Sequence, residues 1–146
     1  MIPAFDQDTG SLPPGIHEAT WEEVVARYGT TSQRLALLSG LKRALDTLRA
    51  AGCQRAYLDG SFVTAKARPG DFDGCWEAHG VDPDLLDPVL LDFTYRRTAQ
   101  KSAYGGEMFL AHGLADPFGT RFLEFFQHDA EGAPKGIIAI NLGGLP

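Results

Sequence analysis

The sequence has no long apolar run and very little cysteine. No hydrophobic stretch approaches the roughly 18–20 residues of a membrane-spanning helix, and Met1 to Asp6 carries neither the basic nor the apolar part of a secretory leader. Cys53 and Cys75 are the only cysteines, and they do not form a C-x-x-C motif. We therefore expect a cytoplasmic protein that keeps its thiols reduced and does not associate with a membrane.

Basic residues are also in short supply. Thirteen Lys and Arg stand against nineteen Asp and Glu, which gives a formal net charge of −6 at pH 7. A protein that coats the backbone of nucleic acid needs the opposite sign, so a nucleic-acid substrate would have to be bound locally. The four histidines are scattered without the spacing of metal ligands, which argues against a zinc site.

The length and apolar content predict one domain. The chain has 146 residues, of which 44% are hydrophobic, enough for one core and too few for a second full domain. We expect residues 1–31 to form an N-terminal arm and a short helix packed on the core, and residues 32–146 to form the domain itself. The expected fold class is α/β (α+β), a small mixed sheet with flanking helices.

The first half of the chain carries clear periodic patterns. Thr20 is expected to cap a short helix that Gly29 ends. A longer helix is expected over residues 32–52, followed by strands at residues 56–58 and 71–76 that are joined by a loop or a single helical turn. The longer helix should pack through leucines at three- and four-residue steps, namely Leu35, Leu38, Leu41, Leu45 and Leu48.

The second half of the chain allows alternatives. A third strand is assigned to residues 89–93, although the same short apolar run could be helical. A basic helix is expected over residues 96–104 and a fourth strand over residues 107–111. Residues 122–126 and 136–140 fit either a helix followed by a strand or a β-hairpin.

A Gly-Ser pair followed by two aspartates is the part of the chain that carries chemistry. Gly60 and Ser61 follow the first of the two strands, and nine residues then separate Ser61 from Asp71. The glycine lets the backbone approach a phosphate, while the serine offers a hydroxyl and an amide N–H. Alternation along a strand puts Asp71 and Asp73 on one side, where both can bind Mg²⁺. The pattern indicates a site for a metal ion and a nucleotide.

This ordered pattern resembles the DNA polymerase β-type nucleotidyltransferase superfamily, in which a Gly-Ser pair after one strand precedes D-x-D on the next. The resemblance covers residues 32 to 93 and implies transfer of a nucleoside monophosphate from an NTP to an RNA end, a protein hydroxyl or a small molecule. It implies a Mg²⁺ or Mn²⁺ cofactor held by Asp71, Asp73 and a third carboxylate on a later strand. Asp92 is the candidate for this third position. The competing acids are Asp87, Glu77 and Glu107.

The segment after Ser61 departs from the superfamily. Many small members carry an Arg there, whereas Phe62 to Lys66 contain none. The positive charge that a triphosphate needs could come from other side chains, namely Lys66, Arg68, Arg96, Arg97 and Lys101. We assign nucleotide binding to Gly60, Ser61, Lys66 and Lys101.

A second resemblance adds a biological setting. Leu12 to His17 and Asp71 to Trp76 resemble the corresponding parts of a family of short bacterial proteins of unassigned function. Superfamily members of this minimal size often belong to toxin–antitoxin or phage-defence systems. The resemblance thus implies a cognate protein partner in addition to the NTP.

Two other functions stay open. Asp59 precedes the Gly-Ser pair and would repel phosphates unless it faces a metal ion or a lysine. This acid and the absent Arg favour the main alternative, a weak or inactive member of the superfamily that acts as a binding or antitoxin-like partner. The third possibility is a glycosyltransferase fragment, because such enzymes also use D-x-D to hold a metal ion and a nucleotide.

Overall fold

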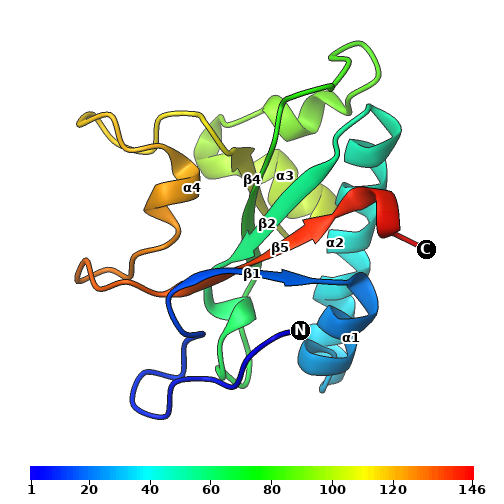
Figure 1. Cartoon of the computed structure of the whole chain (residues 1–146). Coiled ribbons are helices and arrows are strands. Elements are labelled where there is room, and N and C mark those ends of the chain that lie inside the picture. The colour runs from blue at the N-terminus through cyan, green and yellow to red at the C-terminus, as the bar shows by residue number, and fades with distance from the viewer.

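A five-stranded mixed sheet forms the centre of the fold, as a computed structural model of all residues 1–146 shows (Figure 1). The strands are β1 Gly15–Ala19, β2 Arg55–Asp59, β3 Phe72–Trp76, β4 Gly106–Leu110 and β5 Gly136–Asn141. They lie in the order β1-β5-β2-β3-β4. β1 is parallel to β5 and β3 to β4, whereas β2 is antiparallel to both of its neighbours. The C-terminal end of β2 therefore lies beside the N-terminal ends of β3 and β4.

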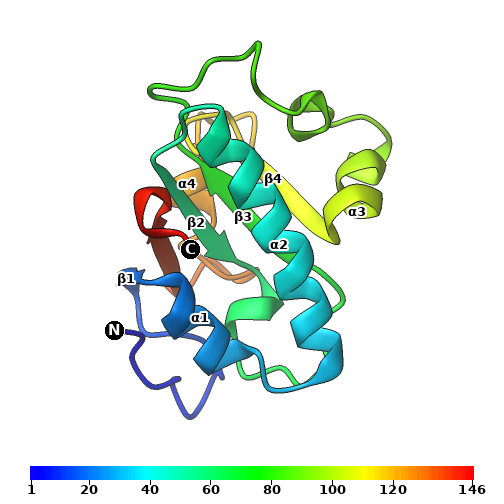
Figure 2. The same ribbon diagram turned by 90° about the vertical axis from the view of Figure 1, so that its right-hand side faces the viewer.

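Three helices cover one face of this sheet and bury the larger core (Figure 2). They are α1 (Trp21–Tyr28), α2 (Ser32–Ala50) and α3 (Thr98–Tyr104). Four leucines of the predicted stripe lie in one buried cluster with apolar side chains of the sheet. The members from α2 and the sheet include Leu38, Leu41, Leu45, Leu48, Leu58, Phe72, Trp76 and Ile138. The expected class, an α/β fold with a mixed sheet and flanking helices, is confirmed.

Local sequence signals explain where the first helices begin. Thr20 Oγ1 accepts a hydrogen bond from the Glu23 amide at 3.1 Å, and Glu23 Oε1 accepts one from the Thr20 amide at 3.1 Å. This reciprocal capping box fixes the first turn of α1, and the predicted cap is confirmed. The predicted stripe is wrong at Leu35, which is 49% exposed, because Leu37 points into the core instead. No helix of the chain combines the length and the apolar content needed to cross a membrane.

The strand predicted at residues 89–93 is wrong. Pro88–Leu91 form a 3₁₀ helix, η2. Asp87 caps this helix by accepting a hydrogen bond from the Val89 amide at 3.0 Å, and Pro88 occupies its first turn, where no amide is needed. These two signals outweigh the β propensity of the apolar run.

Other differences concern the chain ends and the basic helix. Residues of the predicted arm form β1, an edge strand with few buried side chains. The basic helix begins at Thr98, two residues later than predicted. The tail adopts the helix-then-strand alternative, with α4 (Phe122–Phe125) followed by β5.

The second face of the sheet is only partly covered. Figure 1 shows α4 on the side opposite α1 and α2. A small apolar cluster lies under α4 and the residue after it, formed by Tyr57, Cys75, Ala111, Phe126, Ile137 and Ala139. Because side chains alternate along a strand, Asp59, Asp73 and Glu107 lie on this same face. We call it the open face.

Candidate functional site

Three carboxylates lie in a row across the open face. Asp59 is the last residue of β2, and Asp73 and Glu107 are the second residues of β3 and β4. Asp73 lies opposite Asp59 on one side and opposite Glu107 on the other. Because neighbouring strands are about 4.8 Å apart, the central carboxylate has an acid on each side. Asp71, two residues earlier in the chain, adds a further negative charge that acts on Asp73.

Asp73 is the acid most affected by this crowding. Its burial, and then the charges of Asp71, Glu107 and Asp59, raise the pKa of Asp73 to about 7. Burial and the charge of Glu107 also raise the pKa of Asp71, although Lys101 opposes the shift. Carboxylates whose pKa is shifted towards neutrality by burial and by other acids are typical of functional sites.

The two outer acids of the row are paired with basic side chains. Lys135 forms an ion pair with Asp59, so this acid faces a lysine, as the sequence required if phosphates are to bind nearby. Lys101 Nζ lies 2.8 Å and Arg97 Nη2 3.4 Å from Glu107 Oε1. Burial nevertheless raises the pKa of Asp59. The row is thus flanked by positive charge at both ends.

Gly60 brings the Gly-Ser turn into contact with the central acid. Its backbone has φ 80° and ψ −171°, a conformation that favours glycine. A Cβ atom at this position would lie 2.5 Å from Asp73 Oδ2. Ser61 then begins a short 3₁₀ turn in which Phe62 and Val63 are buried. Phe62 and Val63, in the segment that lacks an Arg, thus contribute to the core.

Arg34 of α2 holds the backbone of this turn in place. Its Nη1 donates to the Phe62 carbonyl at 2.8 Å, and its Nη2 donates to the carbonyls of Thr64 at 3.1 Å and Lys66 at 2.5 Å. The side chain is buried, and its burial lowers the pKa of Arg34. Arg34 was not predicted as a functional residue. The only signal was an Arg within a helix, and the carbonyls that it binds lie 28 or more residues away in the sequence.

A polar cleft opens beside the Gly-Ser turn. Its volume is about 770 Å³, and its lining includes Asp59, Gly60, Ser61, His128 and Lys135. Thr64 and Thr120 add hydroxyl groups to the same lining. The cleft offers hydrogen-bond donors and a lysine next to the turn that the sequence predicts as a phosphate cradle.

The structure brings together most, but not all, of the predicted site residues. Asp71 and Asp73 lie with the Gly-Ser turn, and Lys101 joins them through Glu107. Lys66 is exposed, and its charge acts on Asp71.

Asp92 lies apart from this group. It follows η2, and its Oδ1 accepts hydrogen bonds from the Thr94 amide at 3.0 Å and the Thr94 hydroxyl at 2.5 Å. It is not among the acids whose charges shift the pKa of Asp73. Glu107, one of the competing acids, occupies the position beside Asp73 instead.

Comparison with protein families gives a decisive match along almost the whole chain. The model of a family of unknown function, DUF6932, matches residues 3–141. The chain belongs to this family. Neither the curated proteins nor the solved structures contain a match. The chemistry of the site must therefore be argued from its own residues.

Two acids of the site have the chemistry of ligands for a divalent cation. Asp71 and Asp73 make no ion pair with a basic side chain and offer carboxylate oxygens, which Mg²⁺ prefers. A cation beside them would relieve the repulsion that raises both pKa values. No three His, Cys, Asp or Glu side chains already lie close enough together to hold a metal ion. The donor chemistry fits Mg²⁺, and Asp71 and Asp73 are the residues that would hold it.

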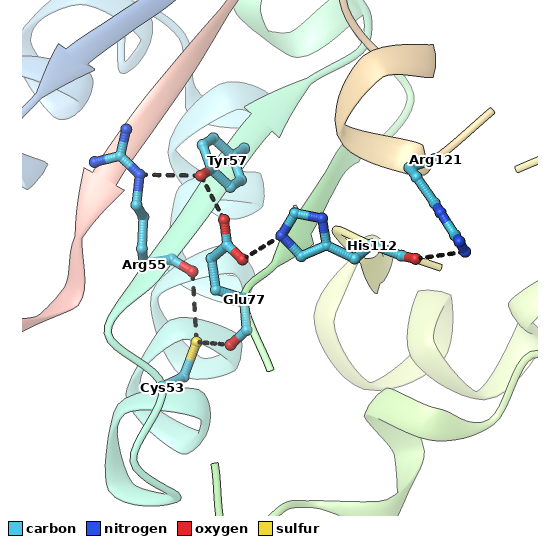
Figure 3. Close-up of polar contacts among 6 residues, drawn as sticks. All are labelled: Cys53, Arg55, Tyr57, Glu77, His112 and Arg121. Atoms are coloured by element: carbon cyan, nitrogen blue, oxygen red, sulfur yellow. Dashed lines mark hydrogen bonds and ion pairs between the residues drawn. The ribbon is translucent and has the colours of Figure 1, made fainter. Parts of the chain in front are cut away.

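A second polar cluster occupies the opposite end of the open face (Figure 3). The Tyr57 hydroxyl donates to Glu77 Oε1 at 2.7 Å and accepts from Arg55 Nε at 3.0 Å. His112 Nε2 lies 2.8 Å from Glu77 Oε2. Figure 3 shows Arg55 and His112 approaching the Tyr57–Glu77 pair from opposite sides. The cluster ties the segment after β4 to the sheet.

Both cysteines are structural in this fold. Cys53 and Cys75 are free and buried. Cys53 Sγ donates to the carbonyls of Glu77 at 3.3 Å and Arg55 at 3.5 Å. Burial raises the pKa of both thiols, which keeps them protonated and unreactive.

Proposed function

We propose that the protein is a metal-dependent nucleotidyltransferase that moves a nucleoside monophosphate from an NTP to an acceptor hydroxyl. One observation carries this proposal. Asp73 lies in register beside Glu107, while Gly60 approaches Asp73 so closely that no Cβ would fit. A phosphate cradle and paired carboxylates in contact are the minimum parts of such an enzyme.

The acids and the Gly-Ser turn would divide the work. Asp71 and Asp73 would hold Mg²⁺ or Mn²⁺, which would neutralise negative charge on the phosphates. Gly60 and Ser61 present backbone N–H groups and a hydroxyl to the β- and γ-phosphates. Glu107 replaces Asp92 as the third carboxylate. It accepts the proton of the acceptor hydroxyl.

The transfer itself is a displacement at the α-phosphorus. The acceptor oxygen forms a bond to the α-phosphorus as the bond to the bridging oxygen breaks, and pyrophosphate leaves. Lys101, Arg97 and Lys135 are the basic side chains closest to the acids, and each can turn from its carboxylate to a phosphate oxygen. In this way the site exchanges internal ion pairs for contacts with the triphosphate.

The net charge of the protein narrows the choice of acceptor but does not identify it. The net charge of −6 disfavours a long nucleic acid and leaves an RNA 3′ end, a protein hydroxyl or a small molecule. We place the protein in the cytoplasm, where NTPs and Mg²⁺ are available. A cognate protein partner in a toxin–antitoxin or defence system fits this proposal, because that partner could supply the acceptor hydroxyl.

Transfer of label from NTPs tests the proposal. The protein is incubated with Mg²⁺, each α-³²P-labelled NTP in turn and a cell extract, and Asp73→Asn is run beside the wild type. We expect transfer of label by the wild type and a loss of at least about 100-fold in the variant, since a metal carboxylate is removed. Equal transfer by both proteins, or none by the wild type, contradicts the proposal.

The ion pairs of the carboxylate row support a second candidate function, in which the protein only binds another protein. Asp59 and Glu107 are already neutralised by lysines, which is the arrangement of an acid cluster that needs no metal ion. On this alternative the protein keeps the fold and acts only by binding another protein. It predicts that no NTP binds in the presence of Mg²⁺, as measured by isothermal titration calorimetry.

A further inference from the structure

An aromatic pocket lies next to the carboxylate row, and apart from Arg97 its lining has no role in the function proposed so far. Its volume is about 340 Å³, and its lining includes Phe93, Arg97, Phe109, Leu114 and Phe122. Phe93 is 39% exposed and Leu114 59% exposed, so the pocket opens to solvent. Five of its seven lining residues are hydrophobic, in contrast to two of thirteen in the polar cleft.

The aromatic rings of the pocket form a stack. The Phe93 and Phe109 rings are nearly parallel, with an interplanar angle of 7° and centroids 5.9 Å apart. Phe109 and Phe122 continue the stack with an angle of 13° and centroids 4.3 Å apart. Phe109 is thus the middle ring of the stack, and Phe93, which is 39% exposed, presents a ring face on which a nucleobase can stack.

Phe109 connects this pocket directly to the proposed site. It lies two residues after Glu107 on β4, on the same face and about 6–7 Å further along the strand. In a nucleotide the base follows the α-phosphate after a single ribose. A triphosphate held by the Gly-Ser turn and the acids would therefore place its base beside this stack, where Phe93 is exposed.

Arg97 links the two parts. Its guanidinium lies 5.5 Å from the centre of the Phe109 ring, and its Nη2 reaches Glu107. This contact at 3.4 Å is the one hydrogen bond of the Arg97 side chain, and its Nε is buried without a partner, so the remaining Nη donors are the ones that can reach a ligand. The residue is held in a left-handed backbone conformation together with Tyr95 and Arg96, with φ of 60°, 49° and 56°. Such a conformation persists only where the surrounding structure enforces it.

We infer that the aromatic pocket is the base subsite of this enzyme and that the ligand class is a purine NTP. The inference rests on the proposed function. The base stacks on the exposed ring of Phe93, and Arg97 contacts the ribose or the α-phosphate. The lining side chains provide stacking surface and no hydrogen-bonding group apart from Arg97, so the larger rings of ATP and GTP bind more tightly than those of CTP and UTP.

Binding of two ligands that differ by the nucleoside separates this subsite from the phosphate site. Inorganic tripolyphosphate and ATP are titrated into the protein with Mg²⁺ by calorimetry. We expect Phe93→Ala to weaken ATP at least about fivefold, the loss of one stacking contact, and to leave tripolyphosphate unchanged. Phe118→Ala is the matched control, because Phe118 is 92% exposed and lies outside the pocket.

A variant that keeps an aromatic ring at position 93 shows whether misfolding causes the loss of ATP binding in Phe93→Ala. Phe93→Trp is expected to bind ATP as tightly as the wild type, and its added fluorescence should be quenched by ATP and not by tripolyphosphate. The base subsite is overturned if Phe93→Ala binds ATP as tightly as the wild type does. It is also overturned if Phe93→Ala loses the same affinity for ATP and for tripolyphosphate. Neither result contradicts the proposed phosphate site. If the wild type binds neither ligand, the proposed function fails and the subsite with it.

Discussion

The two faces of β3 show how one strand serves both stability and chemistry. On the helix-covered face, Phe72 and Trp76 are buried with the leucines of α2. On the open face, Asp73 lies between two other acids. The first face gains free energy from burial, whereas the second holds like charges together at a cost. This cost, which raises the pKa of Asp73 to about 7, is why we place the proposed site on the open face.

The largest stability effect is expected on the helix-covered face. Leu41 is fully buried in the core. Leu41→Ala should lower the free energy of unfolding by about 2–5 kcal/mol, because it removes buried methyl groups and leaves a cavity. Urea denaturation measures the loss. A change below about 1 kcal/mol would mean that this face is packed too loosely to support the comparison.

Gly60→Ala should be the most damaging small substitution on the open face. The variant has to strain a backbone with φ 80° and to push Asp73 Oδ2 away from the new Cβ, at a cost of about 2–4 kcal/mol. Gly119→Ala is the control, since Gly119 also has a positive φ, of 91°, but nothing lies within 4 Å of the added Cβ. Thermal unfolding of both variants isolates the close contact. Similar losses in the two proteins would show that Gly60 and Asp73 do not meet.

Asp73→Asn should act in the opposite direction and stabilise the protein. The pKa of Asp73 is about 7 in the folded protein and about 3.9 in the unfolded chain. The folded state therefore binds the proton more tightly, and this contribution to stability is present below about pH 4 and is lost as the pH rises through 7. At pH 8 the variant should be more stable by about 1–3 kcal/mol.

Denaturation curves from pH 4 to pH 8 check this sign. The gap between Asp73→Asn and the wild type should widen as the pH rises. A wild type that is the more stable protein at pH 8 would contradict the crowded acid row.

The smallest effect is expected at the other end of the open face. His112 is 67% exposed, and its pair with Glu77 is open to solvent. His112→Ala should cost less than about 1 kcal/mol and should leave Mg²⁺-dependent ATP binding unchanged. A loss of ATP binding in this variant would extend the functional surface along the whole face.

Much of the fold was predictable because the signals are local. The capping box of Thr20 and the leucine spacing of α2 are readable within a few residues. The D-x-D strand beside the Gly-Ser strand was also predictable, since the short connection favours neighbouring strands. The strand predicted at residues 89–93 failed because the apolar run was weighed without Asp87 and Pro88, which cap a 3₁₀ helix.

The rest of the site depends on contacts between distant segments. Glu107 lies beside Asp73 only because β4 pairs in parallel with β3, and nothing near Glu107 in the sequence indicates that register. The pairing of Lys135 with Asp59 joins residues 76 apart. The edge strand β1 was missed because its burial alternates weakly and it depends on β5 at the far end of the chain.

Mg²⁺-dependent ATP binding by Asp73→Asn and Asp92→Asn, measured beside the wild type by calorimetry, is the most direct test of the carboxylate row as a nucleotide site. Each variant removes one charge and keeps the shape of the side chain. We expect Asp73→Asn to lose at least about tenfold in affinity for Mg²⁺-ATP, because a proposed ligand of the metal ion is removed, while Asp92→Asn binds like the wild type. Loss in Asp92→Asn with normal binding in Asp73→Asn, or no binding by the wild type, would contradict the carboxylate row as a nucleotide site.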